Sequence, residues 1–190
     1  MRKDFGTKTW FYPQPVMIIA AYDENGEANA MNAAWGGVYA NDKVMLRINH
    51  GHKTTQNIIA RGAFTVAFAD VDNVVASDYV GIVSGNDEPQ KMAKSGFHLT
   101  KSAHVDAPLI EELPVAMECT LVKVNEDGNI IGKIENVSVD ERVLDADGNL
   151  DFTKFRPISF EPAHADYRVL GEKVADAFQI GAQLRSEERR

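Results

Sequence analysis

The chain has 190 residues and a formal net charge of −8, from 20 Lys or Arg against 28 Asp or Glu. This acidic balance excludes proteins that work through a basic face, so we expect neither nucleic acid nor an anionic membrane surface as a partner. A hydrophobic content of 44% and a charged content of 25% are ordinary for a globular protein, and the length suits one domain over residues 1–190.

Cysteine usage and the N-terminus bear on the compartment. Cys119 is the single cysteine, which excludes a disulfide framework and a thiolate metal site and favours a buried structural thiol. The first apolar run is broken by Pro13 and Pro15, unlike the core of a secretory signal. No run approaches the ~18 apolar residues of a membrane span. We therefore expect a cytoplasmic protein.

The first predicted elements form a hairpin. Val16–Tyr22 is apolar at every position, which predicts a strand covered on both faces, by helices or by a second subunit. Asn25-Gly26 then predicts a tight turn of type I′, in which both central residues have positive φ. Further on, Gly36-Gly37 marks either a close approach of the backbone to a ligand or a simple bend.

The next stretch has the spacing of an anion site. Val44–Asn49 alternates as a half-buried strand, and Thr54 or Thr55 offers a hydroxyl N-cap to a short helix that Gly62 would close. A strand, a tight turn and a helix start together present free backbone N–H groups and the positive end of a helix dipole. The alternative is an ordinary capped helix with a solvated lysine.

The remaining elements follow from alternation and turn residues. The strand at 63–69 has small residues on one face, which leave room for a packed helix or for a flat ring. Two more strands are predicted at 115–124 and 130–139. A helical pattern is predicted at 73–95 and a long connection at 97–114. An amphipathic helix is predicted at the C-terminal end, over 167–184, where it would pack on the barrel.

Catalytic side chains are sparse. The chain has no nucleophile elbow and no metal-binding histidine motif, so we expect no catalytic residue and no metal site. Its Asp145–Asp151 stretch fails the calcium-loop spacing and is predicted to be an acidic turn. His98, His104 and His164 are expected to be structural or solvent-facing, because no carboxylate stands at a diagnostic spacing from any of them. His50 and His52 share a turn, where we expect a surface pair or a phosphate contact and not a metal site.

Several motifs in register resemble the flavin reductase family with the FMN-binding split barrel, above all its flavoredoxin-type members. They extend over roughly residues 13–181 and are Pro15-Val16, Asn29-Ala30-Met31-Asn32 with Trp35, Lys53-Thr54-Thr55-x-Asn57-Ile58, Asp78-Tyr79-x-Gly81-Ile82-Val83-Ser84-Gly85, Lys91, and Tyr167-x-x-Leu170-Gly171.

The resemblance implies a mainly β fold, an antiparallel Greek-key split β-barrel with peripheral helices, in agreement with the short, turn-rich strands. It implies an FMN-binding oxidoreductase that transfers hydride from NAD(P)H to flavin. The alternatives are an electron-transfer protein that carries FMN for a protein partner, and a barrel used only as a binding module. A homodimer is also implied, and the doubly apolar strand Val16–Tyr22 supports it.

The resemblance further implies which residues contact FMN. Asn29, Ala30, Met31, Asn32 and Ala33 would run along the isoalloxazine ring, with Trp35 closing the site near the phosphate. The phosphate would be surrounded by Arg47, Asn49, His50, Lys53, Thr54, Thr55 and Asn57. Lys91 is a further candidate, and Tyr167 would lie either beside the ring or in the core.

Overall fold

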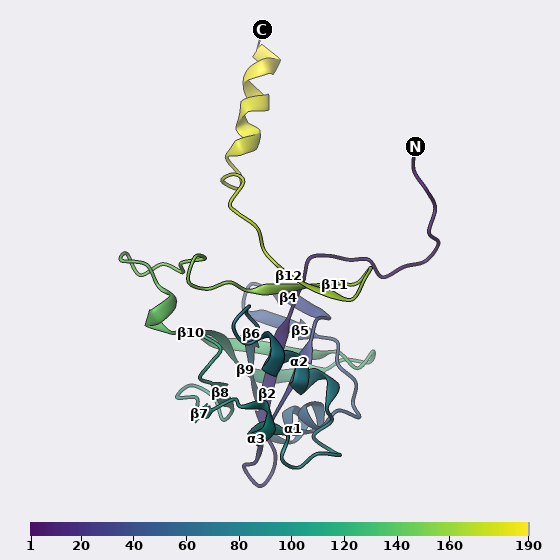
Figure 1. Ribbon diagram of the computed structural model, residues 1–190, viewed down its shortest axis with the longest axis vertical. Helices are drawn as coiled ribbons and strands as arrows, with labels where there is room; N and C mark the ends of the chain where they lie inside the picture. The colour runs from purple at the N-terminus through teal and green to yellow at the C-terminus, as the bar shows by residue number, and fades with distance from the viewer. Residues whose placement is uncertain (190) are drawn as a thin grey trace.

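The computed structural model describes residues 1–189, and an antiparallel sheet of seven strands, in the order β3-β2-β6-β9-β10-β5-β4, is its centre (Figure 1). The strands are β2 Met17–Tyr22, β3 Ala28–Ala33, β4 Gly36–Ala40, β5 Lys43–Leu46, β6 Ala63–Phe68, β9 Val115–Val124 and β10 Ile130–Val139. Two of these, β9 and β10, have the predicted bounds, and β2, β5 and β6 match their predictions to within three residues.

The other elements surround this sheet. Three short strands form a second sheet in the order β1-β11-β12, and β7 pairs with β8. Their bounds are Gln14–Pro15 (β1), Ile158–Glu161 (β11), Asp166–Val169 (β12), Leu99–Lys101 (β7) and Pro108–Ile110 (β8). The helices are α1 Lys53–Arg61, α2 Val74–Ile82, α3 Lys91–Ser95, and the 3-10 turns η1 Glu141–Val143 and η2 Ile180–Arg189. No helix within residues 1–189 is long and apolar enough to cross a membrane.

The strand β2 contributes to the two largest apolar clusters among the described residues. Its residues Met17 and Ile19 face the inside of the curled sheet, where they pack with residues of β3, β5, β6, β9 and β10. Its residues Ile18 and Ala20, on the other face, belong with Val16 just before the strand to a cluster that includes Val80 of α2 and Ile110 of β8. The prediction of a strand covered on both faces is confirmed, and the described chain supplies the cover itself.

The long β9–β10 ribbon is bent. The pairing register between the two strands shifts twice, between Ile131 and Gly132 and between Ile134 and Asn136. Irregularities of this kind increase the local twist and bend a strand. The bend helps the sheet to curl, so that residues of β3 and β5, which are far apart in the strand order, share one apolar cluster.

Three turns share one design, at Asp23–Glu27, Asn125–Asn129 and Asp145–Asn149. In each, the side-chain oxygen of the first residue accepts a bond from the backbone N–H of the fifth. The glycine in fourth place has a φ between 79° and 83°. The hairpin predicted at Asn25-Gly26 is confirmed, but type I′ is wrong, because only the glycine has a positive φ.

The first helix begins differently from its prediction. Its N-cap is His52, and neither Thr54 nor Thr55 caps it, because both lie inside the first turn with their side chains buried. The Thr54 hydroxyl accepts a bond from the Asn29 amide at 2.6 Å instead. The predicted end is confirmed, since Gly62 has a φ of 74° and donates to the Ile58 carbonyl.

The C-terminal end of the chain does not form the predicted helix over 167–184. Tyr167 lies in β12, where it pairs with Phe160 of β11. The chain then leaves the sheets, and η2 stands away from them (Figure 1). The apolar residues Leu170, Val174 and Phe178, whose spacing suggested a helix packed on the barrel, are all exposed.

Two further sequence interpretations need correction. The simple bend offered for Gly36-Gly37 is wrong, because both residues belong to β4. At Gly36 the backbone lies close to protein, since a Cβ there would be 2.6 Å from the Met45 carbonyl oxygen, and a ligand contact by the pair remains a prediction. The connection at 97–114 is not irregular throughout, since it contains the β7–β8 hairpin.

Glycine at position 132 is required by packing. A Cβ at Gly132 would overlap the ring of Phe64, which is fully buried. We expect Gly132→Ala to lower the free energy of unfolding by about 1–3 kcal/mol, the usual cost of overpacking a core. The matched control is Gly37→Ala in the same sheet, where a Cβ meets nothing within 4 Å and the effect should be neutral or slightly stabilising. Urea denaturation of the three proteins measures this, and equal stabilities would contradict the packing argument.

Candidate functional site

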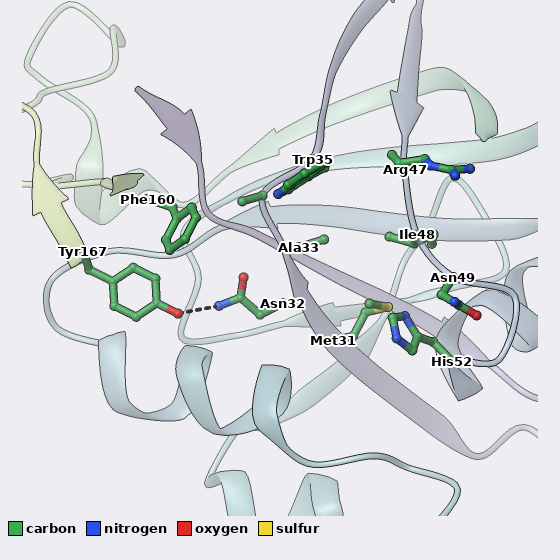
Figure 2. Close-up of a pocket in the computed structure, with 11 residues that line it drawn as sticks. Met31, Asn32, Ala33, Trp35, Arg47, Ile48, Asn49, His52, Phe160 and Tyr167 are labelled. Atoms are coloured by element: carbon green, nitrogen blue, oxygen red, sulfur yellow. Dashed lines mark hydrogen bonds between the residues drawn. The ribbon is translucent and has the colours of Figure 1, made fainter. Parts of the chain in front are cut away.

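Two cavities meet at β3, which is an edge strand of the main sheet. The first, which we call the aromatic cavity, has a volume of about 300 Å³ and is lined by Met31, Asn32, Ala33, Ala34, Trp35, Arg47, Ile48, Asn49, His52, Phe160 and Tyr167 (Figure 2). The second, the lysine cavity, has about 190 Å³ and is lined by Asn29, Met31, Asn32, His52, Lys53, Thr54, Val80, Gly81, Ile82, Val83, Ser84, Gly85 and Lys91. They share Met31, Asn32 and His52.

Three aromatic side chains from different parts of the chain border the first cavity. Trp35 follows β3, and Phe160 and Tyr167 come from the neighbouring strands β11 and β12 (Figure 2). The Phe160 and Tyr167 rings lie edge to face, with centroids 6.3 Å apart. Trp35 is half exposed, so its ring is not part of the core. Such a set offers flat apolar surfaces to a planar ligand.

The Asn32 side chain has a fixed orientation. Its amide nitrogen donates to the Ser77 carbonyl at 3.0 Å. It also donates to the Tyr167 hydroxyl at 3.3 Å, the bond dashed in Figure 2. Both amide hydrogens are therefore used by the protein, and the amide oxygen is left as an acceptor at the boundary of the two cavities. A ligand that carries an N–H or O–H donor matches this position.

The Tyr167 hydroxyl completes the same network. It donates to the Asp78 carboxylate of α2 at 2.7 Å. Burial, and then the bond to this carboxylate, raise the pKa of Tyr167 to about 12. The hydroxyl therefore stays protonated at neutral pH and connects β12 to α2 beside the aromatic cavity.

Two glycines bring α2 and the loop after it close to β3. A Cβ at Gly81 would lie 2.8 Å from the Asn32 Cβ, and a Cβ at Gly85 would overlap the Asn29 side chain. Only glycine allows this distance between the two segments, and the lysine cavity lies between them.

The lysine cavity has an unpaired positive charge. Lys91 is only 3% exposed, and no carboxylate or hydrogen-bond partner of its ammonium is found among residues 1–189. Burial lowers its pKa to about 8, so the group is still mostly charged at neutral pH. The N-terminus of α1 opens on the same cavity at Lys53 and Thr54, and no acidic residue stands in its first turn. This combination favours an anion.

The second lysine of this cavity is paired. The Lys53 ammonium lies 3.2 Å from a carboxylate oxygen of Asp23, in the β2–β3 turn. Burial acts to raise the pKa of the Asp23 carboxyl, but bonds from the turn's backbone and from Lys53 outweigh it and hold the pKa below its ordinary value. Lys53 therefore already has a counter-ion within the protein.

The structure brings eleven of the fifteen predicted site residues to these cavities: Asn29, Met31, Asn32, Ala33, Trp35, Arg47, Asn49, Lys53, Thr54, Lys91 and Tyr167. Four lie elsewhere. Ala30 packs in the apolar cluster on the other face of β3, and Thr55 and Asn57 are buried residues of α1 that line neither cavity. His50 is exposed on the turn beside Gly128. A ligand contact by any of these residues remains a prediction.

Sequence reasoning missed several lining residues, of which Phe160 is the most informative. It lies far along the chain from β3, and nothing in its surroundings signals a contact with Trp35 or Tyr167. The segment Gly81–Gly85, which ends α2 and begins the loop after it, lay within a motif of the resemblance, but its residues were not predicted to be site residues. His52 was noted only as a surface residue or a phosphate contact.

His98 and His164 face solvent, as expected, and each has a carboxylate neighbour that the sequence spacing did not indicate. His98 lies 2.6 Å from Glu112, and this bond raises the pKa of His98. His164 lies 2.7 Å from Glu161. Both histidine side chains are more than two-thirds exposed, at 77% and 73%, and both pairs lie outside the two cavities.

Comparison with known proteins identifies the fold. Flavoredoxin of Desulfovibrio vulgaris (Miyazaki F) is 36% identical, with a TM-score of 0.91 over 95% of this chain and 100% of that one. Flavoredoxin from Methanosarcina acetivorans is 27% identical, with a TM-score of 0.86 over 97% and 100%. An FMN-binding domain of a flavin reductase-like enzyme from Shewanella baltica, 22% identical, has a TM-score of 0.75 over 86% and 89% and shows the same fold.

The predicted fold class is confirmed by these likenesses: the sheet is the curled antiparallel half-barrel of the split-barrel flavin reductases. The family model described as "Flavin reductase like domain" matches residues 9–159, which include β3, α1, α2, α3 and most of both cavities. The chain belongs to the flavin reductase-like domain family, as the resemblance of its motifs predicted.

Proposed function

We propose that this protein holds FMN across the two cavities and passes electrons to or from a protein partner, in the manner of a flavoredoxin. The observation that carries the proposal is the contrast between the adjoining cavities. One has aromatic walls, and the other has an unpaired buried lysine and a helix N-terminus. FMN has the matching contrast, a flat apolar ring and an anionic phosphate. The name of the Shewanella baltica protein, which describes an FMN-binding domain, supports this choice.

The residues that would hold each part follow from their chemistry. Trp35, Phe160 and Tyr167 would contact the ring, and the fixed Asn32 oxygen would accept from a ring N–H. Lys91, with Thr54 and the backbone N–H groups that begin α1, would bind the phosphate. The cofactor would supply the electron-transfer chemistry, which asks the protein only to bind, orient and shield it. This explains why the chain has so few catalytic candidates.

The first prediction concerns the cofactor and its reductant. The purified protein should show bound flavin absorption, and FMN should bind more tightly than riboflavin, which lacks the phosphate. A saturating ligand at a hundred times its dissociation constant should add about 2.7 kcal/mol to stability. Rapid reduction by a ferredoxin-like protein, with slow bleaching by NADH or NADPH, is the expected result. Absence of flavin, with no thermal stabilisation by added FMN, would leave only the binding-module alternative.

A second candidate is an NAD(P)H-dependent flavin reductase that transfers hydride to flavin. The observation that favours it is a third, mostly apolar hollow of about 450 Å³ beside the aromatic cavity. The two share Ala34, Trp35 and Arg47, so a second ligand there would lie next to the first. Rapid bleaching of the bound flavin by NADH or NADPH, faster than by any ferredoxin-like protein, would favour this candidate.

We also propose that the protein is a homodimer, although the face of β2 that suggested this from the sequence is covered within one chain. The support now comes from two arms, residues 1–13 and 170–189, which run away from the sheets (Figure 1). The second arm carries exposed Phe178, Ile180 and Leu184. A ten-residue 3-10 helix has poor hydrogen-bond geometry and is unstable alone, so a second copy is the natural cover for these side chains.

This dimer can be tested through the second arm. Light scattering at micromolar concentration should give a mass of twice 21.0 kDa. The double substitution Ile180→Ser and Leu184→Ser should weaken association by at least tenfold. Each change removes apolar surface that the monomer exposes and the dimer would bury, so less apolar surface leaves water on association. The control is Val75→Ser, which changes an exposed valine of α2 and should leave the mass unchanged. A stable monomer of the unsubstituted protein would contradict the proposal.

A further inference from the structure

Two lysines line one small cavity, but only one of them has a counter-ion. Lys53 is paired with Asp23 at 3.2 Å, and its side chain is one-third exposed. Lys91 is buried, and none of the described residues offers it a carboxylate or a hydrogen bond. An unpaired buried charge is costly, so an anion entering this cavity gains most by approaching Lys91.

The Asp23 carboxylate is held firmly in its position. One of its oxygens accepts the backbone N–H groups of Asn25 and Glu27, at 2.9 Å and 3.0 Å. The other oxygen faces Lys53. Because the turn fixes the carboxylate, Asp23 cannot move aside when an anion arrives. Lys53 would have to leave its partner in order to bind the anion.

We propose that Asp23 and Lys91 set the phosphate affinity of this cavity in opposite directions: Lys91 binds the FMN phosphate, and Asp23 withholds Lys53 from it. This inference rests on the proposed function. Asp23 lowers the affinity of the cavity for phosphate, because it neutralises Lys53, one of the two lysines that line the cavity. Its consequence is a cofactor that binds less tightly than two free lysines would allow and therefore exchanges more readily.

Another turn of this protein shows that a neutral residue can fill the place that Asp23 has in its turn. The turn at Asn125–Asn129 has the same backbone bonds, and its first residue is asparagine, whose oxygen accepts the N–H of Asn129 at 2.8 Å. Asp23→Asn therefore keeps the acceptor that the turn needs and removes only the charge that faces Lys53. Glu24→Gln is the matched control, because it removes the same charge from an exposed neighbour in the same turn.

The test is a fluorescence titration of each variant with FMN and with riboflavin, at low and high salt. Asp23→Asn should tighten FMN binding by about two- to fivefold, the range expected for release of a partly exposed ion pair, with no change for riboflavin. Lys91→Met should weaken FMN binding by about ten- to a hundredfold, as expected for loss of a charge-assisted bond to phosphate, and should leave riboflavin unchanged. Glu24→Gln should change neither affinity.

Asp23 could lower FMN affinity either by pairing with Lys53 or by directly repelling the phosphate, and repeating Asp23→Asn in the Lys53→Met variant separates these two effects. In Lys53→Met, the gain from Asp23→Asn should fall well below its value in the unsubstituted protein. Equal gains in both backgrounds would overturn the role of the ion pair. Equal losses of FMN and riboflavin in Lys91→Met would overturn the phosphate role of Lys91. Thermal unfolding of each flavin-free variant checks that the fold is kept, and Lys91→Met should not be less stable, because it removes an uncompensated buried charge.

The unsubstituted protein separates this inference from the function on which it rests. If it binds neither flavin, the proposed function fails, and this inference fails with it. If it binds FMN more tightly than riboflavin but Asp23→Asn changes nothing, the proposed function stands and the inference alone is overturned.

Discussion

The amide of Asn32 is the contact on which the candidate site depends. It joins β3 to the Ser77 carbonyl of α2 and to the Tyr167 hydroxyl of β12, three segments that are distant in the chain. Tyr167 in turn bonds to Asp78, so α2 and β12 are held to the same edge of the main sheet. Both cavities lie beside this junction. If Asn32 were lost, the Tyr167–Asp78 bond would still join β12 to α2, but the two bonds that tie both segments to β3 at this position would be gone.

Two buried charged residues, one in the core and one at the candidate site, differ in whether the protein supplies them with hydrogen-bond partners. Glu118 is 1% exposed, and its carboxylate accepts bonds from Ser102 and from the Asn136 amide. These bonds outweigh its desolvation and hold its pKa below the ordinary value. Lys91 is buried to a similar degree without any such partner among the described residues. A satisfied buried charge organises the protein, whereas an unsatisfied one stores free energy that a ligand can release.

Sequence reasoning succeeded where structure is local and failed where it depends on distant contacts. The strands β9 and β10 were predicted at their bounds, because alternation and a turn between them specify a hairpin. The cap of α1 was missed because the Thr54 hydroxyl is used by Asn29, 25 residues away. The C-terminal helix was wrong because an i+4 apolar pattern does not say whether a core exists to receive it. Phe160 was missed because its place beside Tyr167 follows from strand pairing late in the chain.

The two register shifts in the β9–β10 ribbon have a consequence for how the site is assembled. They help to bend the ribbon, and the curled sheet brings residues of β3 and β5 into one apolar cluster. The segments that follow these two strands meet at the aromatic cavity, where the Arg47 backbone N–H donates to the Trp35 carbonyl at 2.7 Å. We therefore expect a change of ribbon length at either shift to displace lining residues of the site without altering any of their side chains.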